Sequence, residues 1–206
     1  MLLLCSDGLA SEYLLDTVKE NLRNGKKAAL VVTADHEYKE DNLNIPRCKK
    51  ELQSLGLIVD CFDLDKQPAE LILDYDVVEL MGGNPFYLLS SIRKNKAEAI
   101  LKQIFKEKIL IGWSAGAMVL GCSLELMNKI DPEMNFIKLR DLKGLELAIL
   151  DILTHYENFE KKYKNLETVC QAYEKRLWHP LIRLDDGEGI AIEDSTFVGE
   201  SEEDNW

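Results

Sequence analysis

Short apolar runs alternate with longer amphipathic segments through the first two thirds of the chain. Because short apolar runs bounded by turn residues are typical of strands buried on both faces, we expect strands over residues 1–5, 27–34, 57–64, 76–81 and 108–111. Helical patterns lie between and after them, over residues 11–23, 44–55, 85–94, 96–108 and 117–121. This rhythm predicts an α/β fold with a mostly parallel central sheet and helices on both faces.

The last third of the chain is less regular. It contains the pattern of one long polar amphipathic helix over residues 158–177, and strand patterns over residues 148–154, 181–185 and 189–192. Residues 201–206 form an acidic segment that we expect to be frayed. With 206 residues and no evident linker or repeat, the chain is expected to form one domain spanning residues 1–206.

Five residues between an apolar run and a helix rich in small residues carry the clearest chemical signal. Gly112-Trp113-Ser114-Ala115-Gly116 follows the predicted strand 108–111. Strand, Gly-x-Ser-x-Gly turn and helix is the setting of a nucleophile elbow, in which the serine projects at the top of the sheet. The start of the helix offers unpaired N–H groups where an oxyanion forms. Ser114 is therefore the candidate nucleophile, and the other interpretation is a tight structural turn.

A serine nucleophile needs a neighbouring base, and the chain contains three histidines. Ligands of parallel sheets bind at the carboxyl ends of strands, which sorts these histidines by position. His155 follows strand 148–154 and is the candidate base, or else a structural histidine. His179 precedes strand 181–185, so we expect it at the opposite edge, on the surface or at a helix end. His36 follows strand 27–34 in a polar loop, where it contacts either substrate or solvent.

A carboxylate should orient the imidazole of the base. Asp185 and Asp186 end the strand near residue 185, and adjacent strand residues point to opposite faces, so only one of them can reach His155. We assign Asp186, although Asp-Asp-Gly-Glu-Gly, which includes Glu188, is also ordinary turn composition. The order serine, acid, histidine of α/β-hydrolases would instead select Asp131, Asp141 or Asp151.

Composition narrows the classes of function. The formal net charge of −12 argues against nonspecific nucleic-acid binding, which needs Lys and Arg to neutralise phosphates. No run approaches the ~20 apolar residues that span a bilayer, and we expect no signal peptide. The five cysteines are scattered and odd in number, as expected for reduced thiols of a cytoplasmic protein. No His, Cys, Asp or Glu residues have metal-motif spacing, so we expect no metal and no organic cofactor.

Three segments resemble the dipeptidase E and cyanophycinase group of serine peptidases. Residues 77–89 resemble its strand ending in Gly-Gly-Gly-Asn-Thr-Phe, residues 111–117 its nucleophile motif, and residues 153–156 its Pro-His-Phe/Tyr at the catalytic histidine. The resemblance implies a three-layer α/β sandwich like that of the class I glutamine amidotransferases, with serine replacing their cysteine. It also implies Ser114 as nucleophile, His155 as base, and the N–H groups of Gly83 and Ala115 as the oxyanion hole.

This sequence departs from the family pattern beside these motifs. Met81 and Pro85 replace the first glycine and the threonine of the glycine motif, and Thr154 replaces the proline before the histidine. The family's acid also varies: some members carry Glu where Asp186 stands, and an acid near Asp131 is another candidate.

A second departure concerns specificity. Some family members recognise an N-terminal aspartate through an arginine after the histidine. The corresponding segment here carries Lys161, Lys162 and Lys164 instead. A lysine binds a carboxylate only as a point charge, and these lysines also suit a solvated helix face.

The sequence thus predicts a serine peptidase of the dipeptidase or exopeptidase type. It would hydrolyse short peptides through an acyl-enzyme, without nucleic-acid or membrane partners, as a monomer or homodimer. One alternative is an esterase or acyl hydrolase that uses the same elbow. The other is a catalytically weak binding or regulatory module on this fold.

Overall fold

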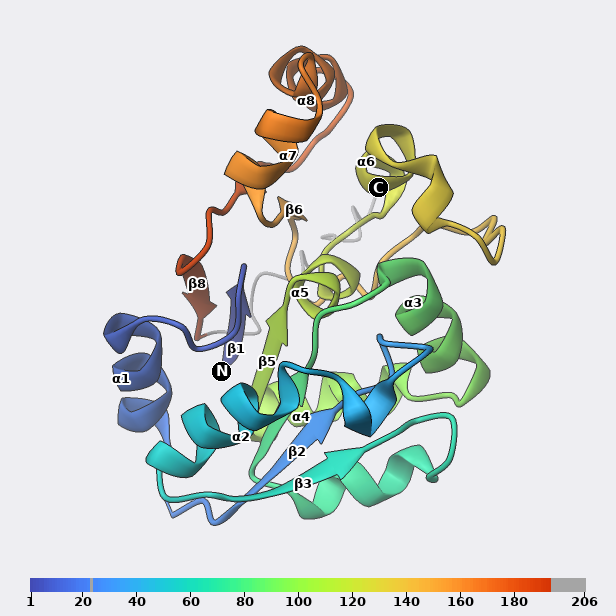
Figure 1. The fold of residues 1–206 in the computed structure, drawn as a ribbon. Helices are drawn as coiled ribbons and strands as arrows, with labels where there is room; N and C mark the ends of the chain where they lie inside the picture. Colours follow the sequence, from blue (N-terminus) through green and yellow to red (C-terminus); the bar gives the residue numbers. More distant parts are fainter. Residues whose placement is uncertain (23, 194–206) are drawn as a thin grey trace, which may run out of the picture.

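A computed structural model describes residues 1–22 and 24–193 of the chain, so the expected frayed segment at 201–206 lies outside the described residues. Its centre is a six-stranded sheet with the strand order β3-β2-β4-β5-β1-β8 (Figure 1). The parallel strands are β1 (Leu2–Cys5), β2 (Lys27–Val31), β3 (Ile58–Phe62), β4 (Val77–Leu80) and β5 (Ile109–Trp113). The edge strand β8 (Gly189–Ile192) pairs antiparallel with β1. The predicted α/β fold with a mostly parallel sheet is confirmed.

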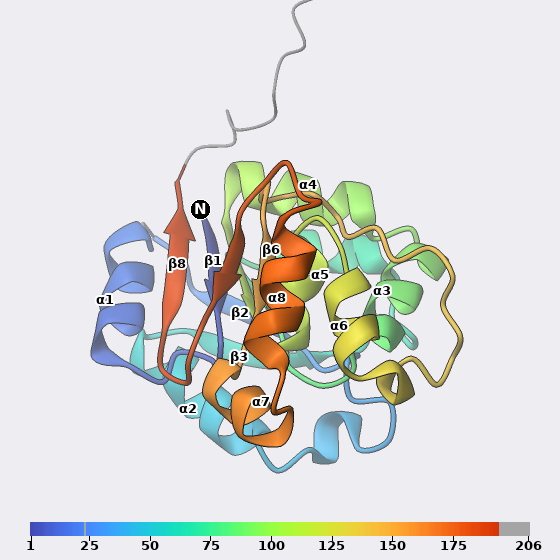
Figure 2. The ribbon, with the colours of Figure 1, turned by 90° about the horizontal axis from the view of Figure 1, so that it is seen from above.

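Helices cover both faces of the sheet and make a three-layer arrangement (Figures 1 and 2). One face packs against α1 (Glu12–Asn21) and α2 (Ile45–Ser54). The other face packs against α3 (Pro85–Lys94), α4 (Glu98–Glu107) and α5 (Ala115–Leu120). Successive strand residues alternate between these two cores, and this double burial is why the central strands are continuous apolar runs.

The last third of the chain builds a smaller unit on the α5 side of the sheet. Two short parallel strands, β6 (Asp151–Leu153) and β7 (Leu181–Arg183), form a separate pair. Three helices surround it: α6 (Glu125–Ile130), α7 (Tyr156–Lys162) and α8 (Leu166–Glu174). Apolar side chains of α6, α8, β6 and β7 join the same core as α3 to α5.

Two predictions for this region are wrong. The strand expected over residues 148–154 extends only over β6, and the helix expected over residues 158–177 is two helices, α7 and α8. The break falls at Tyr163, which has an extended backbone, and Asn165, which occupies the N-cap position of α8. Asparagine favours helix starts over helix interiors, whereas apolar periodicity alone continues through the break.

Elsewhere the structure corrects boundaries and adds short elements. The strands β2, β3 and β4 end one to three residues earlier than expected, whereas β5 ends two residues later, at Trp113. Ser11 lies at the N-cap of α1, but its side chain makes no hydrogen bond to the helix. Short 3-10 helices occur at Lys39–Asp41, Ala69–Asp74 and Pro132–Met134. None of the helices in residues 1–22 and 24–193 has the length and apolar character that crossing a bilayer requires.

Candidate active site

The backbone turns at one residue, Ser114, between β5 and α5. Ser114 has φ 50° and ψ −115°, a conformation that L-residues rarely adopt. Its N–H donates to the carbonyl of Cys5 at 3.0 Å, which continues the β1–β5 pairing, and its side chain makes no capping hydrogen bond to α5. Ser114 is half-buried at the carboxyl edge of the sheet. This is the geometry of a nucleophile elbow, and strain of this kind concentrates at functional sites.

Both glycines of the elbow are required by close packing. A Cβ on Gly116 would lie 2.1 Å from the carbonyl oxygen of Leu80, at the end of β4. A Cβ on Gly112 would lie 2.7 Å from the carbonyl of Gly116. The missing side chains therefore let α5 begin directly against β4 and β5, with its first N–H groups at the edge where Ser114 lies.

Two backbone N–H groups near the elbow are unpaired. One belongs to the residue after Ser114, and the other to the connection that follows the neighbouring strand β4. Ala115 begins α5, where helix geometry leaves the N–H without an internal acceptor. Gly83 follows β4, the sheet neighbour of β5, and has φ 142°; a Cβ there would lie 2.6 Å from the backbone carbonyl of Ala34. Within residues 1–22 and 24–193, neither N–H has a hydrogen-bond acceptor. Both are available to an oxyanion.

A histidine and an aspartate meet at the carboxyl ends of β6 and β7. His155 occupies the N-cap of α7 in a left-handed conformation (φ 54°, ψ 37°), and its Nδ1 lies 2.5 Å from Oδ1 of Asp186. Burial alone would raise the pKa of Asp186. The hydrogen bond and charge of His155, together with hydrogen bonds from Ser6 and Asn158, outweigh burial and lower that pKa below its ordinary value. Asp186 is thus an ionised partner for the imidazole.

Ser6 connects this pair to the elbow. It directly follows β1 and is fully buried. Its hydroxyl accepts a hydrogen bond from the N–H of His155 at 2.8 Å and donates to Oδ1 of Asp186 at 3.2 Å. The residue before it, Cys5, accepts the N–H of Ser114. Ser114 and His155 are therefore both bonded to the same end of β1.

The sequence analysis did not identify Ser6 or Asn158 as site residues. The position of Ser6 directly after a buried strand was a signal that could have identified it.

The other acids considered from the sequence have other partners. Asp185 accepts the N–H of Glu157 at 2.8 Å, and Glu188 accepts the N–H of Asp185 at 2.9 Å, so both order the turn. Asp131 accepts hydrogen bonds from Tyr163 at 2.6 Å and Lys162 at 3.0 Å. Asp151 accepts a hydrogen bond from the hydroxyl of Tyr173, and Asp141 forms an ion pair with Arg93.

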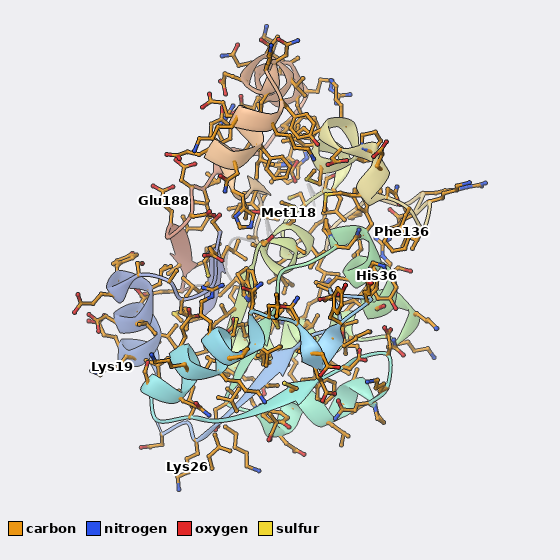
Figure 3. All side chains as sticks on the ribbon, in the orientation of Figure 1. Lys19, Lys26, His36, Met118, Phe136 and Glu188 are labelled. Carbon is orange, nitrogen blue, oxygen red and sulfur yellow. The ribbon has the colours of Figure 1, made fainter. Side chains whose placement is uncertain are left out.

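The two remaining histidines lie apart from this pair. The ring of His36 packs against Phe136 and Tyr87, with centroids 4.6 and 5.5 Å away. Figure 3 shows His36 and Phe136 side by side, and the backbone of Ala34 in the same loop contacts Gly83. His179 precedes β7 at the opposite end from His155, as expected. It is not a surface residue, however, because its side chain is only 6% exposed and lies beside Asp151.

The site has the features of a serine hydrolase. These are a strained serine at a strand-to-helix turn, two free N–H groups, and a histidine–aspartate pair at the same edge of the sheet. The comparison with known proteins agrees. The family model of peptidase family S51 matches residues 2–198, so the chain belongs to this family and is a serine-type peptidase. The resemblance found in the sequence is confirmed at the level of the family.

Individual relatives are distant but cover most of the chain. An uncharacterized peptidase of Listeria monocytogenes is 28% identical over 81% of this chain and 83% of its own length. A Peptidase E of a Nostoc species is 28% identical over 95% of this chain and 83% of its own length. Among solved structures, a candidate peptidase E protein of Listeria monocytogenes superposes with a TM-score of 0.75 at 25% identity, covering 93% of both chains.

Proposed function

We propose that this chain is a peptidase of the dipeptidase or exopeptidase type, with Ser114 as nucleophile, His155 as general base and Asp186 as its orienting acid. The observation that carries the proposal is the 2.5 Å contact between His155 Nδ1 and Asp186. With the imidazole proton on Nδ1, facing this carboxylate, the lone pair of Nε2 is left to accept the proton of Ser114 in the proposed mechanism.

The chemistry follows the geometry of the site. Ser114 Oγ attacks the scissile carbonyl while His155 takes its proton, and the ionised Asp186 stabilises the imidazolium. The N–H groups of Gly83 and Ala115 hold the oxyanion. His155 then gives its proton to the leaving amine, and the acyl-enzyme forms on Ser114. Water, deprotonated by His155, releases the acyl group and restores the serine.

The substrate we propose is a short peptide, in keeping with relatives named Peptidase E. Recognition of an acidic first residue by Lys161 or Lys162 is not supported. Lys161 is paired with Glu157 at 3.1 Å and Lys162 with Asp131 at 3.0 Å, so neither charge is free. The aromatic side chains of His36, Tyr87 and Phe136 lie next to the Gly83 segment and offer a face for an apolar side chain of the peptide.

Replacement of the nucleophile tests the proposal. Ser114→Ala should lower kcat by at least ~10³-fold on the best dipeptide of a library while leaving the circular dichroism spectrum unchanged. A fluorophosphonate probe should label the wild type at Ser114 and should not label the variant. Ser90→Ala on α3 is the matched control and should behave as the wild type.

Three outcomes would contradict the proposal in different ways. Wild-type turnover by Ser114→Ala would mean that Ser114 is not the nucleophile. Turnover of esters without turnover of any dipeptide would favour an esterase or acyl hydrolase. Failure of wild-type protein to react with the probe or any substrate would favour a binding or regulatory module.

A further inference from the structure

A second group of chemically capable side chains lies at the opposite end of the β6–β7 pair from His155. Cys122 follows α5, Asp151 is the first residue of β6, and His179 precedes β7. One ligand atom from each lies within 4.8 Å of the others. These residues are far apart in the sequence, which is why no metal motif was found by spacing. The proposed catalytic site does not use any of them.

This cluster contains polar atoms that the protein leaves unpaired. Asp151 and His179 have side chains only 2% and 6% exposed. Among the described residues, Asp151 Oδ1 and both ring nitrogens of His179 have no hydrogen-bond partner. Buried polar groups are nearly always satisfied, because an unmade hydrogen bond costs roughly 1–3 kcal/mol. An unpaired carboxylate oxygen and an unpaired imidazole in one buried cluster indicate a missing ligand.

The distances suit a metal ion better than a hydrogen bond. His179 Nε2 and Asp151 Oδ2 are 3.4 Å apart, which is long for a direct N–H···O bond of roughly 2.7–3.2 Å. Two ligands held at about 2.0–2.2 Å from a tetrahedral zinc ion lie about 3.4 Å from each other. Tyr173 donates a hydrogen bond to Asp151 Oδ2 at 2.7 Å and so orients the carboxylate, as groups behind metal ligands commonly do.

The donor set identifies the class of ion. A thiolate, an imidazole and a carboxylate are ligands of zinc, whereas magnesium and calcium take oxygen ligands only. We propose that Cys122, Asp151 and His179 bind one zinc ion, with water in the fourth position. Cys122, Ser123, Tyr173 and His179 line a cavity of about 470 Å³ that gives the ion and the water access. When the zinc–sulfur bond forms, the thiol proton leaves to solvent.

A zinc ion at this site would link α5, β6 and β7, the elements next to the residues of the proposed triad. Cys122 lies just beyond the helix that Ser114 begins, while Asp151 and His179 lie at the starts of the strands that end near His155 and Asp186. A zinc ion therefore fixes α5 to β6 and β7. Its role is structural, because it lies at the far end of both strands from His155 and Asp186.

Metal titration of the full chain tests the proposal. After dialysis against a chelator, the protein should bind one equivalent of Zn²⁺ by calorimetry, and its melting temperature should rise. Co²⁺ should give visible d–d bands of a tetrahedral ion and a thiolate charge-transfer band in the near ultraviolet. His179→Gln and Cys122→Ser should weaken zinc binding by at least about 100-fold, and Tyr173→Phe by roughly 10–100-fold.

Matched controls separate this site from zinc binding elsewhere on the chain. Cys61→Ser, a half-buried thiol on β3, should keep full binding. Ser114→Ala should also bind zinc normally, and the zinc-free wild type should still react with a fluorophosphonate at Ser114, so the two proposals fail independently. Absence of saturable binding, a cobalt spectrum without the thiolate band, or undiminished binding by a folded His179→Gln variant would each overturn the zinc site.

Discussion

At the scale of single residues, two strained positions are both hydrogen-bonded to the end of β1. Ser114 and His155 both have positive φ without being glycine, which costs of order 1–3 kcal/mol each. Ser6 bonds the backbone of His155, and the adjacent Cys5 bonds the backbone of Ser114. The strain is thus held by hydrogen bonds to one rigid, fully buried strand, which is the arrangement expected of a preorganised site.

The role proposed for Asp186 can be tested by replacing its carboxylate. Asp186→Asn removes the ionised group that holds the imidazole of His155 in place and stabilises its charged form, so kcat should fall by about 10³–10⁴-fold. Steady-state kinetics on the best dipeptide measures the loss, with folding checked by circular dichroism.

Two neighbouring acids serve as controls for Asp186. Asp131→Asn and Glu188→Gln should change kcat by less than ~10-fold, because Asp131 is bonded to Tyr163 and Glu188 to the backbone of Asp185. A larger loss in either control than in Asp186→Asn would mean that the acid is assigned wrongly. The Ser114–His155 pair could still stand in that case.

At the scale of elements, the connection after β4 and the start of α5 supply one proposed oxyanion donor each. Gly83→Ala should lower kcat by about 10²–10³-fold, because a Cβ would lie 2.6 Å from the Ala34 carbonyl and displace the N–H. Steady-state kinetics on the best dipeptide measures the effect. Stability should also fall, by about 1–3 kcal/mol, since φ 142° disfavours L-residues.

Gly56→Ala is the matched control for Gly83→Ala. Gly56 also has a positive φ, of 83°, but a Cβ there would meet nothing within 4 Å and it lies before β3. This variant should lose stability without losing activity. Equal activity losses in the two glycine variants would mean that backbone strain, rather than a displaced donor, causes the loss at Gly83.

Helices and strands could be predicted from the sequence where the local residue preferences and the apolar pattern indicate the same element. The bounds of α3 are as expected, because Asn84 accepts the N–H of Tyr87 as an N-cap and Pro85 suits the first turn. The paired strands of the central sheet were found from their apolar runs. The break between α7 and α8 was not, because the periodicity continues through it. The contact of Ser6 with His155 and the meeting of Cys122, Asp151 and His179 join distant segments, so only the folded chain shows them.

At the scale of the whole molecule, one carboxyl group is buried at a position where burial disfavours its charged form. Glu79 is in the middle of β4, fully buried, and both of its carboxyl oxygens lack a hydrogen-bond partner within the described residues. Burial, with the nearby charge of Glu51, raises the pKa of Glu79 to about 8, although the positive charge of Arg47 acts in the opposite direction. The folded chain therefore holds Glu79 neutral at pH 7.

This predicts a stability that falls as pH rises. The pKa of Glu79 is about 8 in the folded chain against an ordinary value of 4.5, so between these values the folded state binds more protons than the unfolded state. Each pH unit inside this window then costs up to roughly 1.4 kcal/mol, or about 3 kcal/mol between pH 5 and 8. Below the window the carboxyl group is neutral in both states and the cost vanishes.

The comparison of Glu79→Gln with the wild type isolates this cost. The amide is neutral at every pH, so urea unfolding at pH 5, 7 and 8 should show the variant gaining stability relative to the wild type as pH rises. Glu20→Gln, on the exposed side of α1, should follow the wild type throughout. Parallel curves for Glu79→Gln and the wild type would mean that Glu79 is ionised and paired in the fold. Because Glu79 lies on the strand that leads to Gly83, its neutrality also keeps a negative charge away from the N–H group proposed to hold the oxyanion.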